Sequence, residues 1–184
     1  MNALWSYFWP LFALGLIAGA IAGSVGFRAP RAKAGLSAAA KASLLTSWKR
    51  RRTTALLAGL AAAIAGAGLW HGPAGGAQRF AGSVEREARR TLDYYEMTQV
   101  TARLSRDPLS RRLQLSGPAD DFQRGELVRI MGGLAGVSDA GWSADSGVPL
   151  VLEAALLAIA SFLAGLVLAY LVELRRRYNA QWSW

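Results

Sequence analysis

The chain has 184 residues, of which 53% are hydrophobic and only 18% are charged, whereas an average soluble domain carries roughly 25% charged residues. It contains no cysteine and a single histidine, His71, which excludes disulfides, thiol nucleophiles and zinc sites built on thiolates or on several histidines. The net charge is +9. This composition is unfavourable for catalysis and typical of a membrane protein.

Three stretches are nearly free of charged residues, at about 4–27, 54–70 and 149–174. A bilayer core about 30 Å thick requires about 20 helical residues. Because backbone amides in hydrocarbon must be satisfied internally, each stretch is expected to form a helix. We therefore predict transmembrane helices over residues 1–27, 54–70 and 149–174, and consider buried helices of a soluble protein the weaker alternative.

The basic residues indicate the orientation of these spans. Segment 28–53 carries eight Lys or Arg and no acidic residue, three arginines follow the third span, and segment 71–148 carries ten Arg and ten Asp or Glu. Cytoplasmic loops carry the excess of Lys and Arg. We predict an outside N-terminus, a cytoplasmic loop at 28–53, an outer segment at 71–148 and a cytoplasmic tail at 175–184. Because the predicted outer domain is neutral, no nucleic-acid partner is expected.

Cleavage of the first span as a signal peptide is a less favoured alternative. The span has no positively charged start, and its apolar run exceeds the 7–15 residues of a typical signal sequence. Cleavage would also place the basic segment 28–53 outside, against its charge.

Small residues recur at four-residue spacing in all three spans. Such strips allow helices to approach closely, which is how helices associate in lipid. Two uses remain open: packing of the three spans against one another, or packing against another subunit or a second copy. The expected helix-packing residues are Gly15, Gly19, Gly23, Gly59, Ala63, Gly66, Ser161 and Gly165.

Charged groups at the ends of the spans are further candidates. Glu153 lies about one turn inside the third span, where an ionisable group is a candidate for ion or proton handling. Its partner could be Arg79, His71 or none. A structural or neutral role is the simpler alternative. The run Lys49, Arg50, Arg51 and Arg52 directly precedes the second span, where it fixes topology or contacts anionic lipid. The stretch 35–48 is compatible with a helix on the membrane surface.

The outer segment predicts the order α-β-β-α-β. After a glycine-rich linker at 71–77, Ser83 is expected to cap the first helix. Alternating apolar residues predict strands from Val100 to Leu104 and up to Ser116, separated by a turn at 106–108. A second helix is expected to begin near Asp120. The apolar residues of this helix follow the helical period at Leu127, Ile130, Met131 and Leu134. Residues 137–142 are expected to form a third strand. The fold class is thus three transmembrane helices plus a small α+β domain.

One pattern in this segment resembles a known family. A strand ending in Leu115-Ser116-Gly117 is followed by a helix and by Leu134-Ala135-Gly136-Val137 before the last strand. This resembles the BON domain over about residues 84–142. The resemblance implies a non-enzymatic domain, periplasmic or membrane-associated, linked with envelope integrity and with binding of phospholipid surfaces. It also implies a bacterium with an outer membrane, and it supplies no catalytic residue.

The domain offers few groups for chemistry. It has no His, Cys or Lys, and the adjacent Asp120 and Asp121 suit a helix N-terminus better than a catalytic pair. We expect no catalytic residue, no cofactor and no bound metal. Four arginines are candidates for contact with anionic headgroups or an acidic partner, with a solvated surface as the simpler alternative: Arg111, Arg112, Arg124 and Arg129.

These features predict a non-enzymatic inner-membrane protein that is an accessory or scaffolding subunit of a larger membrane or cell-envelope assembly. Its expected partners are the phospholipid bilayer and other integral membrane subunits or a second copy. The alternative is a channel or transporter element in which glycine-rich helices oligomerise and Glu153 lines the mouth. A membrane enzyme is the least favoured class.

Overall fold

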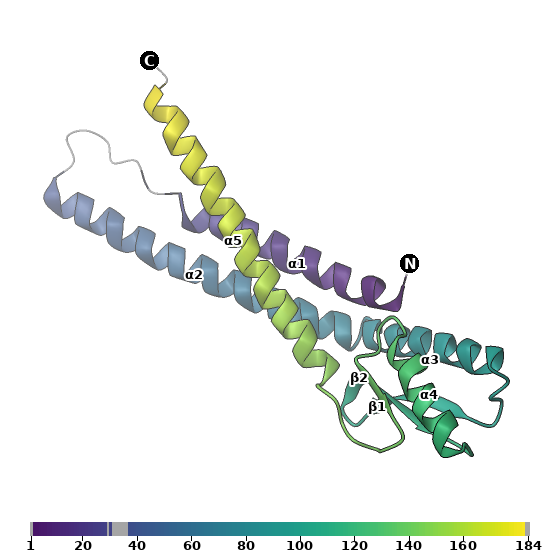
Figure 1. Cartoon of the computed structure of the whole chain (residues 1–184). Coiled ribbons are helices and arrows are strands. Elements are labelled where there is room, and N and C mark those ends of the chain that lie inside the picture. Colours follow the sequence, from purple (N-terminus) through teal and green to yellow (C-terminus); the bar gives the residue numbers. More distant parts are fainter. Residues whose placement is uncertain (1, 29, 31–36, 183–184) are drawn as a thin grey trace. The chain divides into compact units, whose positions relative to one another are not determined.

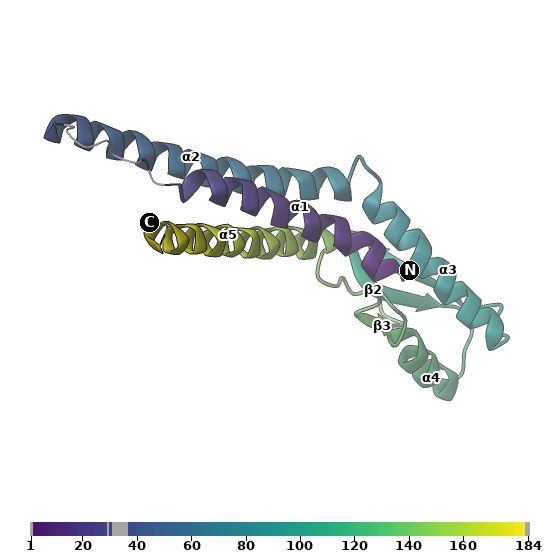
Figure 2. The same ribbon diagram turned by 90° about the horizontal axis from the view of Figure 1, so that it is seen from above.

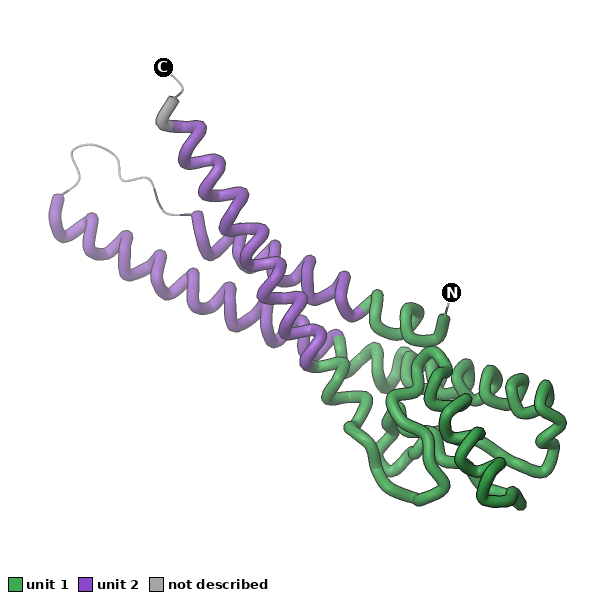
Figure 3. The backbone as a smooth tube through the Cα atoms, in the orientation of Figure 1, with its two compact units in different colours: residues 1–10, 67–155 green, residues 11–66, 156–184 purple. Residues whose placement is uncertain are grey.

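The computed structural model describes residues 2–28, 30 and 37–182, with side chains to residue 180. Parts of the predicted cytoplasmic loop (29 and 31–36) and of the predicted tail (183–184) therefore lie outside the described residues. The chain divides into two compact units (Figure 3). We name them the domain unit, Met1–Pro10 with Ala67–Ala155, and the helical unit, Leu11–Gly66 with Leu156–Trp184.

Eight elements follow one another along the described chain (Figure 1). They are α1 (Ala3–Gly26), α2 (Ala38–His71), α3 (Gly76–Tyr94), β1 (Thr101–Arg106), β2 (Leu109–Ser116), α4 (Asp121–Gly132), β3 (Asp139–Gly141) and α5 (Leu150–Trp182). Three of them, α1, α2 and α5, are long and apolar enough to cross a membrane, which agrees with the three predicted spans and indicates a membrane protein.

Helix α2 is longer than the span predicted from its apolar residues. It runs for 34 residues, so the segment 38–53 of the predicted cytoplasmic loop is helix continuous with the second span. The stretch 35–48, compatible in sequence with a helix, is helical from residue 38. Ala, Leu, Lys and Arg dominate this segment, and no Gly or Pro interrupts the chain from 37 to 58. At the start of α2, the Ser37 hydroxyl accepts a hydrogen bond from the Ala40 amide at 3.3 Å. The predicted tail is likewise helical, since α5 continues to Trp182.

In the domain unit, the order of elements between α2 and α5 is the predicted one. The sheet has the order β1-β2-β3, with β1 and β2 antiparallel and β2 and β3 parallel. Leu104 pairs with Leu113, which pairs in turn with Ala140, so these side chains share one face. All three are buried, as are Val84 and Leu92 of α3 and Leu127 and Met131 of α4.

The first helix of the domain begins earlier than predicted. Gly75, in the left-handed region at φ 69°, precedes α3, so only residues 72–75 separate α2 from α3. Ser83 is therefore not a cap; its hydroxyl donates to the Phe80 carbonyl inside the helix at 3.1 Å. The buried face extends back to Ala77 and Phe80, two positions that the prediction omitted.

The second helix is capped as its sequence predicts. The Asp120 carboxylate accepts a hydrogen bond from the Gln123 amide at 2.7 Å, and the Gln123 side chain accepts one from the Asp120 amide at 3.1 Å. We expect Asp120→Ala to cost about 1 kcal/mol of α4 stability. Hydrogen exchange of the α4 amides should accelerate in Asp120→Ala and stay near the native rate in Asp120→Asn, which keeps the acceptor. Equal acceleration in both variants would contradict this role.

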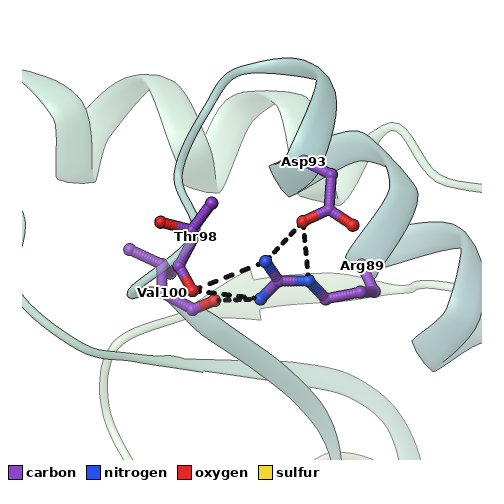
Figure 4. A network of polar contacts seen from close by, with 4 residues as sticks. All are labelled: Arg89, Asp93, Thr98 and Val100. Atoms are coloured by element: carbon purple, nitrogen blue, oxygen red, sulfur yellow. Dashed lines mark hydrogen bonds and ion pairs between the residues drawn. The ribbon is translucent and has the colours of Figure 1, made fainter.

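One arginine of α3 holds the connection to the sheet (Figure 4). Arg89 pairs with Asp93 one turn later, and its guanidinium donates to the carbonyl oxygens of Val100 at 3.1 Å and Thr98 at 3.4 Å. The planar guanidinium makes these bonds together, which a lysine ammonium cannot reproduce.

We therefore expect Arg89→Lys to lower the free energy of local opening of residues 95–100 by about 1 kcal/mol. Hydrogen exchange of the amides in that connection should be faster. The neighbouring Arg90→Lys is the control, because Arg90 pairs only with the exposed Glu87 among the described residues, at 3.5 Å. The role assigned to Arg89 is wrong if both variants exchange at the native rate.

Candidate functional site

The helical unit brings α1 and α5 into backbone contact through their small residues. A Cβ placed on Gly15 would overlap the Ser161 side chain, and one placed on Gly19 would overlap the Phe162 carbonyl oxygen. Gly165 is equally confined, since a Cβ there would overlap the Leu16 carbonyl oxygen. These positions accept only glycine without separation of the helices.

Small residues also bring α2 into close contact with α1, and the two helices run along each other in both views (Figures 1 and 2). A Cβ placed on Gly59 would lie 2.6 Å from the Ala22 Cβ, and one on Gly66 would lie 2.8 Å from the Leu14 side chain. Ala63 is fully buried in a cluster with Ala22 and Phe162.

The last two predicted packing residues also lie inside the unit. A Cβ on Gly23 would lie 2.6 Å from the Ala169 Cβ, and Ser161 is buried with its hydroxyl donating to the Leu157 carbonyl at 2.8 Å. The structure thus places all eight predicted positions within the three-helix packing of one chain, which was the first of the two uses left open.

A further small-residue surface remains uncovered by the described chain. An apolar groove of about 710 Å³ lies between α1 and α2. Ile17, Ile21 and Val25 form its α1 side, and Ala55, Ala58 and Ala62 are on its α2 side. Ile17 and Ile21 are 58% and 61% exposed. The floor formed by small side chains gives another helix room to approach closely.

Glu153 has a cationic partner in the domain unit. Arg111 of β2 donates to its carboxylate at 3.2 Å, and both side chains are 23% exposed. The Arg111 Nε also donates to the Gly136 carbonyl at 3.0 Å. The expected partners were wrong: Arg79 lies over the Trp70 ring at 5.0 Å, and His71 Nδ1 is 2.7 Å from the hydroxyl of Tyr7, within hydrogen-bond distance. The pair ties the start of α5 to the sheet.

Arg112 is also used within the domain. Its guanidinium pairs with Asp139 at 2.9 Å and with Asp145 at 3.3 Å. Contact with a partner stays a prediction for these two residues, although Arg111 and Arg112 already pair with carboxylates of the chain itself. Arg112 meets Asp139 because the parallel β2–β3 pairing places Asp139 opposite Arg112.

The other two arginines of that set remain at the surface. Arg124 is exposed over the Trp142 ring at 5.2 Å. Arg129 hydrogen-bonds Glu126 one turn before it, which lowers the pKa of the Glu126 carboxyl and raises the pKa of the Arg129 guanidinium. Arg124 and Arg129 keep the exposure that a contact with an anionic partner requires.

Arg52, the last residue of the basic run of α2, belongs to a cluster that the sequence did not predict. Lys49, Arg50, Arg51 and Arg52 are exposed, and the Arg52 guanidinium lies over the rings of Phe27 at 5.6 Å and Trp48 at 5.7 Å. The Trp48 indole donates to the Arg28 carbonyl at 2.9 Å, and Arg177 donates to the Phe27 carbonyl at 2.9 Å.

This cluster joins the end of α1 to α2 and α5. Its members are distant in sequence, and the only local signal was the placement of aromatic residues beside basic ones at the predicted span ends.

In the described residues, no group of three or more His, Asp or Glu side chains is placed to hold a metal ion. Comparison with known proteins supplies no assignment either: no family model matches the sequence, and neither the curated proteins nor the solved structures give a match.

Proposed function

We propose that this chain is a non-enzymatic structural protein of a bacterial inner membrane, which presents a BON-like domain to the periplasm and docks other integral membrane subunits of a larger envelope assembly. The observation that carries the proposal is the uncovered apolar groove between α1 and α2, with its floor of alanines. Lipid provides no hydrophobic reason for helices to associate, so an unfilled surface of this kind favours a helix partner.

The orientation in this proposal follows from charge. Lys49 to Arg52 flank one end of the second span, and Arg175 to Arg177 follow the apolar part of the third, while segment 71–148 is neutral overall. Such an arrangement favours a cytoplasmic position for the basic ends and a periplasmic position for the domain.

The pairing of Glu153 favours a structural role over the alternative of a channel or transporter element. A carboxylate held by Arg111 at 3.2 Å is neutralised inside the domain unit and is not a free group at a pore mouth. Symmetric self-assembly through the groove is the outcome that would support that alternative.

Filling the groove tests the proposal. The double variant Ala58→Leu with Ala62→Leu adds bulk to its α2 side, and Ala164→Leu adds the same kind of bulk at an exposed position of α5 outside the groove. After gentle detergent extraction, native mass spectrometry should show a hetero-complex in the wild type and in Ala164→Leu, and the single chain in the groove variant.

Two results would overturn the scaffold proposal. The first is a wild-type protein that runs only as a single chain. The second is a homo-oligomer that the groove variant dissociates, because it would assign the groove to self-assembly.

A further inference from the structure

A second, smaller hollow of the helical unit lies between α1 and α5, with a volume of about 250 Å³. Its walls change character along the helices. One end is apolar, lined by Ala20, Leu168, Ala169 and Val172, and the other is polar, lined by Ser24, Arg28, Glu173 and Arg176. We call this the Arg28–Arg176 hollow. A surface that is apolar at one end and cationic at the other matches an amphiphilic anion.

The positive charges at the polar end outnumber its one carboxylate, that of Glu173. In the described residues of the helical unit, nine Lys or Arg face a single carboxylate, that of Glu173. Glu173 pairs with Arg176 at 2.9 Å and with Arg177 at 3.0 Å, so one carboxylate serves two guanidinium groups. Arg28 has no carboxylate within ion-pair distance among the residues that the structure describes. An external anion is therefore favoured beside Arg28 and Arg176.

The position of the hollow selects the kind of anion. It lies where the apolar residues of α1 and α5 give way to arginines, and Tyr170 and Trp48 lie near the same ends, as aromatic residues do at a membrane–water interface. Phospholipid phosphates lie at this depth. A free phosphate would satisfy the arginines but would leave the apolar walls of Leu168 and Val172 uncovered.

We propose that the Arg28–Arg176 hollow binds one anionic phospholipid. Its phosphate lies between the two guanidinium groups near Ser24, and the first part of an acyl chain lies along Ala20, Leu168 and Val172. Arg favours this role because its planar guanidinium offers two donors to a phosphate. The inference rests on the proposed membrane placement of the helices, but not on the docking groove between α1 and α2.

The test uses the full chain in detergent, with native mass spectrometry of bound lipid. Phosphatidylglycerol and phosphatidylcholine are titrated into the wild type, into Arg28→Gln with Arg176→Gln, and into the control Arg86→Gln with Arg103→Gln. Both pairs remove two exposed charges, but only the first pair lines the hollow. Thermal unfolding in the same detergent identifies any variant that fails to fold.

The wild type should retain phosphatidylglycerol more tightly than phosphatidylcholine by about tenfold. The hollow variant should lose that preference, and the control should keep it within about twofold, because neither of its arginines lines the hollow. Equal losses in both variants would show diffuse attraction and overturn the site. Displacement of the lipid by excess inorganic phosphate, or a hollow variant that unfolds, would also overturn it. If the hollow variant loses the lipid preference but still forms the hetero-complex, the loss concerns the hollow alone and leaves the scaffold proposal intact.

Discussion

Replacement of Gly19 with leucine is expected to separate the helices of the helical unit without shortening the apolar run of α1. A Cβ at this position would lie 2.9 Å from the Phe162 carbonyl carbon and 3.1 Å from the Gly165 Cα, besides overlapping the Phe162 carbonyl oxygen. These are backbone atoms of α5, which cannot rotate away as a side chain can. We expect a loss of about 3 kcal/mol or more, measured by unfolding of the purified protein in mixed micelles.

The control is Gly68→Leu in α2. A Cβ at Gly68 has no heavy atom within 4 Å among the described residues, and the residue is exposed. This substitution should change the free energy of unfolding by about 0.5 kcal/mol or less. Equal stability of the two variants would mean that α1 and α5 do not meet at Gly19.

Removal of Arg111 is expected to destabilise the domain unit. Arg111→Met leaves the carboxylate of Glu153 partly buried without its cation and removes the bond to the Gly136 carbonyl. Breaking a fully buried pair costs about 3–5 kcal/mol, and since both side chains are 23% exposed here, we expect about 2 kcal/mol. The double variant Arg111→Met with Glu153→Leu should recover part of that loss, which a double-mutant cycle measures.

Additive losses in that cycle would contradict coupling between the two side chains. Ion flux in liposomes provides an independent check on their role. A wild-type flux that Glu153→Gln abolishes would make Glu153 a transport group and would support the channel alternative.

The long elements were predictable because their signals are local. An apolar run of about 20 residues identifies each span without knowledge of its neighbours. The boundaries were less predictable, as α3 shows. Phe80 is buried partly because Gly136, far along the chain, leaves room for it; a Cβ there would lie 3.2 Å from the Phe80 ring. No local pattern carries that information, so the first helix was expected to begin near Ser83.

The candidate sites were also predictable only where their signal is local in the sequence. The glycines of α1 were predictable from their four-residue spacing, because the spacing itself creates the flat surface. The partner of Glu153 was not, because Arg111 lies 42 residues away and reaches it only through the placement of β2. The carboxylates that pair with Arg112 were not predictable for a similar reason, since they become its neighbours only when β3 pairs with β2.

Cysteine accessibility tests the central claim, that the domain and the basic helix ends lie on opposite sides of a membrane. The chain contains no cysteine, so a single introduced thiol reports one position. Ser138 of the domain and Ser43 of α2 are both exposed and close in size to cysteine. In bacterial cells whose outer membrane has been permeabilised, a membrane-impermeant maleimide should label Ser138→Cys and should reach Ser43→Cys only after lysis. Labelling of Ser43→Cys but not Ser138→Cys before lysis, or labelling of both before lysis, would contradict the account.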